Sequence, residues 1–139
     1  MQLVDSYPVI VTERLAECRD FYARWFGFKV VFEADWFVLL KSPGEPAFAL
    51  AFMLVEHPSS PPNPAAHGGD GMFLTLQVED SGAAHKRLRS AGLELALGLT
   101  DEPWGQRRFV VVDPAGMWVD VVEQIEPVAG WWDPYVRTE

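Results

Sequence analysis

Residues 103–123 read PWGQRRFVVVDPAGMWVDVVE. The valine-rich segments on both sides of DPAG are typical of strands, and the Asp, Pro and Gly of DPAG favour a tight turn between them. The second segment places a single acid, Asp120, among valines and two residues after Trp118. Such an acid either ligates a metal in an enzyme or lines a pocket that only binds, unless it forms an ion pair with Arg107 or Arg108.

A strand, a helix and three further strands are predicted twice along the chain. Apolar residues recur at helical spacing after the first strand of each copy, and a glycine (Gly27 or Gly92) ends each helix. The second helix begins at Asp80–Ser81, a pair suited to cap it. The first copy has apolar Leu15, Cys18, Tyr22 and Trp25 on its helix and strands at 8–12, 28–33, 36–41 and 47–54. The second has Ala84, Leu88 and Ala91 on its helix and strands at 73–78, 93–98, 107–112 and 117–123.

This βαβββ repeat predicts the fold class. A four-stranded sheet with one helix leaves one face uncovered, so the two units are expected to form a cupped, barrel-like mixed sheet with the helices outside, an α+β fold. We expect one domain over residues 1–139. It divides into a unit at 5–56, a Pro- and Gly-rich loop at 57–71, a unit at 72–126 and an aromatic tail at 127–139.

Side-chain alternation along the strands predicts which residues face the cup. Bulky residues of 47–54 are assigned to the helix side and small ones to the cup, and the fifth and last strands alternate in the same way. The helix side then holds Phe48, Leu50, Phe52, Leu54, Met117, Val119 and Val121. The cup side holds Ala49, Ala51, Met53, Phe73, Thr75, Gln77, Trp118 and Asp120.

Composition restricts the classes of partner. A net charge of −9 argues against nucleic acid, because phosphate contacts need clustered Lys and Arg. No apolar run approaches the roughly 20 residues of a membrane span, and the N-terminus lacks the pattern of a secretory signal. The single cysteine, Cys18, excludes an internal disulfide. We therefore expect a cytoplasmic protein that contacts neither membranes nor nucleic acid.

Two motifs and the repeat together resemble the vicinal oxygen chelate superfamily, the glyoxalase, bleomycin-resistance and dioxygenase proteins. RDFYARWFGF at 19–28 is similar to the end of the first helix in that family, and residues 103–123 are similar to its PWG–DPAG–strand ending. The resemblance covers roughly residues 5–126. It implies a cup built from paired βαβββ units and a homodimer with pockets between subunits. It does not fix the activity, because this fold carries many chemistries.

The resemblance also implies where a metal would be held. Enzymes of the family ligate a divalent ion from four cup-facing strand positions, which fall here on Tyr7, Ala51, Phe73 and Asp120. Only Asp120 is an ordinary ligand, since methyl and phenyl groups offer no lone pair. We therefore expect no metal and no cofactor, and no catalytic residue is assigned.

The remaining reactive side chains do not restore a metal site. His85 is expected on the solvated side of the second helix. His57 and His67 fall in the loop at 57–71, where no regular element fixes their geometry. Cys18 lies on the apolar stripe of the first helix, which favours a core role over a nucleophilic one.

The aromatic residues favour binding. Metal-free bleomycin-resistance-type members of the family hold flat drugs between aromatic walls, and Phe32, Phe37, Ala51 and Trp104 match their pocket pattern. We predict non-catalytic sequestration of an aromatic natural-product antibiotic, neutral or cationic, of bleomycin, mitomycin, quinoxaline or enediyne type, which would confer drug resistance. The predicted ligand-binding set is Tyr7, Phe32, Phe37, Ala51, Met53, Phe73, Thr75, Trp104, Phe109, Trp118 and Asp120.

Two alternatives remain open. One is an enzyme of the same superfamily, a lyase, isomerase or dioxygenase-like protein, with an atypical or absent metal site. The other is a binding module with a carrier or regulatory role. Trp131 and Trp132 are expected to pack the tail or to form dimer contacts.

Overall fold

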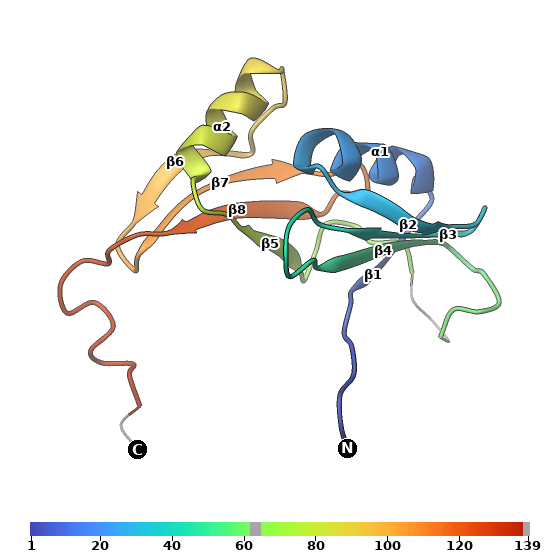
Figure 1. Cartoon of the computed structure of the whole chain (residues 1–139), viewed down its shortest axis with the longest axis horizontal. Coiled ribbons are helices and arrows are strands. Elements are labelled where there is room, and N and C mark those ends of the chain that lie inside the picture. The colour runs from blue at the N-terminus through green and yellow to red at the C-terminus, as the bar shows by residue number, and fades with distance from the viewer. Residues whose placement is uncertain (62–64, 138–139) are drawn as a thin grey trace. The chain divides into compact units, whose positions relative to one another are not determined.

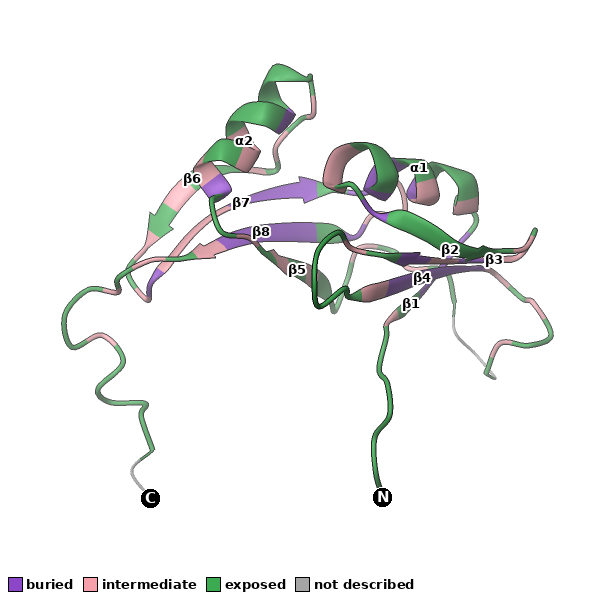
Figure 2. Ribbon diagram, in the orientation of Figure 1, coloured by how far each residue is buried: buried purple, intermediate pink, exposed green. Residues whose placement is uncertain are grey.

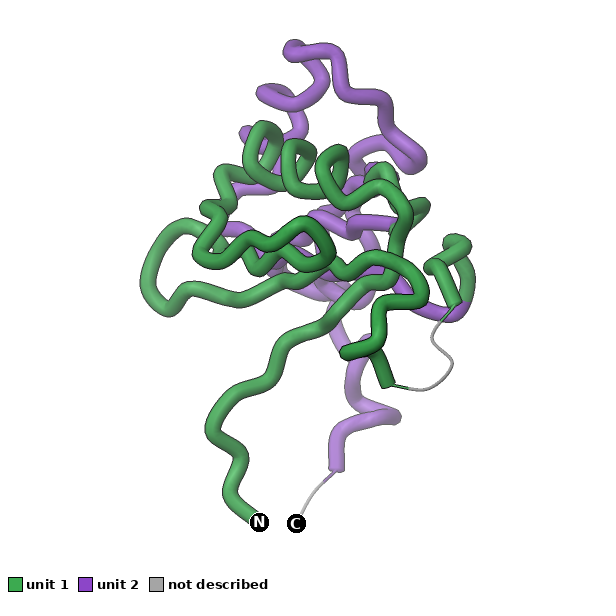
Figure 3. The backbone as a smooth tube through the Cα atoms, turned by 90° about the vertical axis from the view of Figure 1, so that its right-hand side faces the viewer, with its two compact units in different colours: residues 1–70, 113–117 green, residues 71–112, 118–139 purple. Residues whose placement is uncertain are grey.

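The computed structural model describes residues 1–61 and 65–137, so parts of the predicted loop at 57–71 and tail at 127–139 lie outside the described residues. The described chain forms two four-stranded sheets, each with one helix (Figure 1). It divides into two compact units (Figure 3). Unit 1 comprises residues 1–70 and 113–117, and unit 2 comprises residues 71–112 and 118–139.

Unit 1 contains the first βαβββ arrangement. Its sheet has the order β1-β4-β3-β2, with β1 parallel to β4 and the other neighbours antiparallel. The first strand therefore lies beside the last one, and α1 connects β1 to the edge strand β2. The elements are β1 (Val9–Thr12), α1 (Leu15–Phe26), β2 (Lys29–Glu33), β3 (Phe37–Lys41) and β4 (Ala49–Leu54).

Unit 2 repeats this topology. Its sheet has the order β5-β8-β7-β6, with β5 parallel to β8 and the other neighbours antiparallel. The elements are β5 (Phe73–Gln77), α2 (Ser81–Ser90), β6 (Leu97–Glu102), β7 (Gln106–Val112) and β8 (Trp118–Gln124). The prediction of an α+β fold made of two βαβββ units is confirmed.

The strand predicted at 93–98 is wrong at its start, because β6 begins at Leu97. Gly92, at a φ of 95°, donates from its backbone N–H to Arg89, and the next residue, Leu93, donates to Leu88. These bonds close the end of α2 in the manner of a helix C-terminal motif. Residues 93–96 therefore serve as the connection from the helix to the strand.

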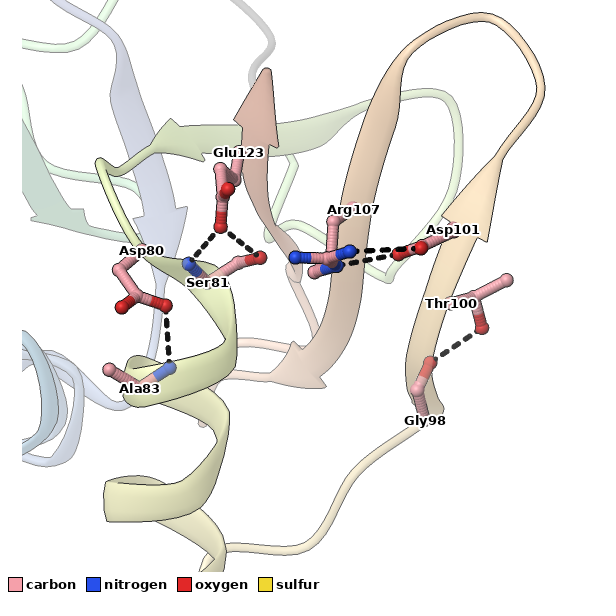
Figure 4. A network of polar contacts seen from close by, with 8 residues as sticks. All are labelled: Asp80, Ser81, Ala83, Gly98, Thr100, Asp101, Arg107 and Glu123. Carbon is pink, nitrogen blue, oxygen red and sulfur yellow. Dashed lines mark hydrogen bonds and ion pairs between the residues drawn. The ribbon is translucent and has the colours of Figure 1, made fainter. Parts of the chain in front are cut away.

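Both helices have local signals at one end. Gly27 follows α1 with a φ of 72°, a left-handed conformation that residues with a Cβ rarely adopt. At the start of α2, Asp80 Oδ1 accepts from the Ala83 N–H at 2.9 Å (Figure 4). Glu123 of β8 accepts from both the N–H and the hydroxyl of Ser81, which ties this end of α2 to its sheet. Trp25, predicted on the buried stripe of α1, is only half-buried and lies under the Arg24 guanidinium.

The core of unit 1 includes a buried polar contact. Tyr22 of α1 is fully buried, and its hydroxyl donates to Asp113 Oδ2 at 2.7 Å. The other carboxylate oxygen accepts from the backbone N–H groups of Ala115 and Met117, so Asp113 organises the DPAG turn. Burial raises the pKa of the Asp113 carboxyl, and burial together with the nearby Asp113 raises the pKa of Tyr22.

Cys18, one turn before Tyr22 on α1, belongs to the same core. Its side chain is fully buried, as predicted from the apolar stripe, and burial raises the pKa of its thiol to about 12. A thiol with so high a pKa stays protonated at neutral pH and is a poor nucleophile.

The predicted faces agree with the observed burial only in part. Leu54, assigned to the helix side, is half-buried, and three residues assigned to the cup side are buried: Ala51, Met53 and Asp120. Leu50, Phe52 and the three apolar residues of the last strand assigned to the helix side are buried (Figure 2). Phe48 is 67% exposed. It precedes β4, and its backbone N–H and C=O bond to Ser42 across the turn from β3, so strand alternation does not govern its side chain. No helix in the described part of the chain is long and apolar enough to cross a membrane.

Replacing Tyr22 with Phe removes only the hydroxyl and leaves Asp113 Oδ2 without its donor. We expect this change to lower the free energy of unfolding by about 1–3 kcal/mol, the usual cost of an unsatisfied buried acceptor. Urea unfolding of the two proteins measures it. The matched control is Tyr7→Phe, at an exposed tyrosine, which should change stability little. Equal stability of Tyr22→Phe and the wild type would contradict this role for Asp113.

Candidate functional site

Most predicted site residues of unit 2 lie on one face of its sheet. In the register of β5 with β8, Phe73 pairs with Trp118 and Thr75 pairs with Asp120, so these four side chains share a side. In the register of β7 with β8, Val110 pairs with Asp120. We call the surface formed by Phe73, Thr75, Arg108, Val110, Trp118, Asp120 and Val122 the Asp120 face.

The other face of this sheet lies under α2 and contains Phe109. Phe109 is fully buried, and His85 of α2 meets its ring edge-on at a centroid distance of 5.5 Å. The expectation of a solvated His85 is therefore wrong, since this half-buried ring packs onto the sheet. Phe109 was predicted to bind ligand, but it lies on the α2 side, so we leave it out of the candidate site.

Asp120 is the central charged group of the Asp120 face. It is only 5% exposed, and its Oδ2 accepts from Arg108 Nη1 at 3.3 Å. Arg108 Nη2 donates to Glu102 Oε2 at 2.8 Å, so one guanidinium lies between two carboxylates. Burial raises the pKa of the Asp120 carboxyl, while Arg108 opposes the rise and Glu102 adds to it. The structure thus confirms the ion pair of Asp120 with Arg108.

Arg107 does not take part in this pair. Its guanidinium binds Asp101 of β6 through two contacts of 2.6 and 3.0 Å (Figure 4). Successive residues of a strand point to opposite faces, so Arg107 lies on the α2 side when Arg108 lies on the Asp120 face.

Trp104 is held by several neighbours in the turn between β6 and β7. Its indole N–H donates to Gln106 Oε1 at 2.8 Å, and the Arg108 guanidinium lies 5.3 Å from its ring centroid, within range of a cation–π contact. The Trp131 ring lies 5.9 Å away on the C-terminal tail. Trp104 thus connects the ion pair of Asp120 to an aromatic surface.

The tail forms an aromatic cluster, which agrees with the first of the two roles expected for Trp131 and Trp132. Trp131 contacts the rings of Trp132 and Tyr135 as well as that of Trp104. Trp132 fixes the tail to the turn, because its indole N–H donates to the Trp104 carbonyl at 2.7 Å. The tail therefore packs on its own unit at the candidate site.

The remaining predicted site residues belong to unit 1. Ala51 and Met53 are buried on β4, and Tyr7 and Phe32 are about half exposed. The Phe32 and Phe37 rings lie 6.1 Å apart across β2 and β3. Sequence reasoning missed the neighbouring stack of Trp36 on His57, with centroids 3.9 Å apart and an angle of 4°.

The residues at the metal-ligand positions implied by the family do not fit a metal. In unit 1 these positions hold Tyr7 and Ala51, and in unit 2 they hold Phe73 and Asp120. Asp120 already neutralises Arg108, and the implied ligand position on the neighbouring strand β5 holds the phenyl ring of Phe73. Within residues 1–61 and 65–137, no three His, Cys, Asp or Glu side chains gather in a group that could hold a metal ion. No step through a metal is therefore derived.

Comparison with known families identifies the class of protein. Residues 6–121 match the model of the Glyoxalase/Bleomycin resistance protein/Dioxygenase superfamily. The chain belongs to this superfamily. Comparison with curated protein sequences gives no significant match.

Solved structures with the same fold have different names. A superfamily member from Sphaerobacter thermophilus is 26% identical with a TM-score of 0.69, covering 88% of this chain and 98% of its own. TioX from Micromonospora is 19% identical with a TM-score of 0.67, covering 86% and 97%. A lactoylglutathione lyase from Agrobacterium tumefaciens is 18% identical with a TM-score of 0.66, covering 86% and 92%. At 18–19% identity, the last two likenesses concern the fold alone.

The turn that presents Trp104 depends on Gly105. Its φ is 104°, and a Cβ there would lie 2.9 Å from the Ile125 carbonyl oxygen. Gly105→Ala should therefore lower the free energy of unfolding by about 1–3 kcal/mol through backbone strain. The control is Gly98→Ala in β6, where a Cβ meets nothing within 4 Å, and stability should be unchanged or slightly higher. Thermal unfolding compares the two, and equal midpoints would contradict the constraint.

Proposed function

We propose that the protein binds and sequesters an aromatic natural-product antibiotic without converting it, and so confers resistance to that drug. The observation that carries this proposal is the composition of the Asp120 face. Exposed rings of Phe73 and Trp118 lie beside a buried, already neutralised acid. Such a surface can stack on a flat ligand and orient it by hydrogen bonds.

The side chains at the positions where relatives chelate a metal support binding over catalysis. Ala51 and Phe73 offer no lone pair, and Asp120 is engaged by Arg108. The reactive side chains of the core are equally unsuited to nucleophilic chemistry, since Cys18 is buried with a raised thiol pKa. The second candidate is an enzyme of the same superfamily. This candidate is retained because the protein shares its fold with a lactoylglutathione lyase.

Replacing Trp104 with Ala should weaken drug binding by roughly 5- to 150-fold, which corresponds to about 1–3 kcal/mol for an aromatic anchor. Tryptophan-quenching titrations with bleomycin, mitomycin, quinoxaline and enediyne drugs measure the affinity. The matched control is Trp25→Ala on α1, which removes an indole outside the candidate site and should leave affinity unchanged.

Recovery of the drug separates the two functions. After long incubation, sequestration returns unmodified ligand, and the purified protein carries no stoichiometric metal. A converted product, or a metal that survives dialysis and is lost from Asp120→Asn, would establish the enzyme instead. Binding of none of these drugs would reject sequestration of this class of ligand.

We also propose that two copies associate through β2. This edge strand exposes Val30, Val31 and Phe32, with Lys29 and Glu33 at its ends. These side chains would cover those of a second copy, and the bulge between Val30 and Phe32 leaves Val31 without a partner residue on β3. The exposed apolar side chains of β2 thus form a surface that association of two copies removes from water.

Val31→Glu should convert the dimer to a monomer, because association would bury a carboxylate within the apolar contact. Sedimentation over a range of concentrations measures the association. The control is Val128→Glu, the same change at another exposed valine outside β2, which should leave the dimer intact. A wild-type monomer at all concentrations, or a dimer unaffected by Val31→Glu, would rule out this interface.

A further inference from the structure

Two polar atoms of the Asp120 face lack protein partners. Asp120 Oδ1 and Arg108 Nε are buried and have no hydrogen bond to any of the described residues. One is an acceptor and the other carries an N–H donor. Buried polar groups in folded proteins are nearly always paired, so two such atoms on one ion pair call for an explanation.

Asp120 and Arg108 cannot pair their free atoms with each other without breaking a contact that they already make. Arg108 already uses Nη1 on Asp120 and Nη2 on Glu102, at 3.3 and 2.8 Å. Turning either side chain to engage the free atoms would break one of these contacts. Both residues also come from inner strands, since β7 and β8 each have a neighbour on both sides. The donor and the acceptor are therefore held in place.

A charged ligand group satisfies only one of the two free atoms, because a cation offers donors alone and an anion offers acceptors alone. The Arg108 guanidinium lies between two carboxylates, so a cationic ligand would bring its charge next to Arg108. An anionic ligand would bring its charge next to Asp120 and Glu102. A neutral group that offers both an N–H and a carbonyl oxygen meets neither repulsion and fills both free atoms.

We infer that the Asp120 face recognises an aromatic ligand through a carboxamide-type group, an amide, lactam or imide whose N–H binds Asp120 Oδ1 and whose carbonyl accepts from Arg108 Nε. The inference rests on the proposed function and names the chemistry of its ligand. Trp118 lies two residues before Asp120 on the same face of β8, about 7 Å away along a strand, and pairs with Phe73. The ring of the ligand stacks there while its amide reaches the ion pair.

Four small probes of one shape test this inference. Naphthamide has the N–H and the carbonyl, N,N-dimethylnaphthamide lacks the N–H, naphthoate is an anion and naphthamidine is a cation. Titration calorimetry on the full-length protein should show naphthamide binding about tenfold or more tightly than each of the others, as expected when a buried polar group loses its partner. Equal affinity for all four, or tightest binding of naphthoate or naphthamidine, would overturn the inference.

Two variants locate the binding. Asp120→Leu and Arg108→Met remove the acceptor and the donor with little change in side-chain size, and each should reduce naphthamide affinity about tenfold or more. Dimethylnaphthamide keeps only the carbonyl, so Arg108→Met should weaken its binding and Asp120→Leu should leave it nearly unaffected. The control is Asp101→Leu, which breaks the exposed pair with Arg107 on the other face of the sheet and should change nothing. Unchanged naphthamide binding to both variants would place it elsewhere and reject the assignment. The probe series in the wild type keeps the test decisive if a variant fails to fold.

The outcomes also separate this inference from the proposed function. If drugs are sequestered but the four probes bind alike, the antibiotic-binding role stands and the carboxamide assignment falls. If naphthamide is preferred but none of the drugs binds, the recognition chemistry stands and the ligand belongs to another class.

Discussion

The hydrogen bond from the Tyr22 hydroxyl to Asp113 joins segments 91 residues apart. The same carboxylate shapes the DPAG turn through two backbone N–H groups, and the turn sets where β7 ends and β8 begins. The register of β7 with β8 determines which side chains lie on the same face of the sheet as Asp120. A buried acid in the helix packing of unit 1 therefore also fixes the starting point of the strand that carries the candidate site. Because burial raises its pKa, Asp113 depends on all three donors.

The fold was predictable because its signals are local and periodic. Apolar spacing and Gly27 marked α1, Asp80 marked the start of α2, and alternation in residues 117–123 placed Trp118 and Asp120 on one face. The predictions of side-chain face and strand start fail at positions outside the regular helices and strands. Phe48 lies in a turn, so strand period does not apply to it. The start of β6 moved because Gly92 and Leu93 complete the helix end before extended structure resumes.

The candidate site was predictable only in part, because the sequence of one strand does not determine its register with the next. Alternation makes Arg107 and Phe109 share one side of β7 and leaves Arg108 on the other. Which side faces Asp120 follows only from the pairing of Val110 with Asp120. Without that register, Phe109 could be assigned to the pocket, and the choice between the two arginines stayed open. The contact of Trp131 with Trp104 could not be predicted for a similar reason. Contacts between a turn and a distant segment produce no regular spacing of residues in the sequence.

The ion pair accounts for a buried carboxylate at a position where the family resemblance implies a metal ligand. A buried carboxylate needs a compensating cation, and a metal ion and a guanidinium both supply one. They differ in what they leave for a ligand. A metal offers open coordination positions that polarise an oxygen and support catalysis. Arg108 offers a directed N–H and leaves one oxygen of Asp120 free, an arrangement suited to hydrogen bonding with a neutral group. An arginine at this place is therefore suited to directed hydrogen bonding and a metal to polarising an oxygen, although both can sit on strands of the same topology.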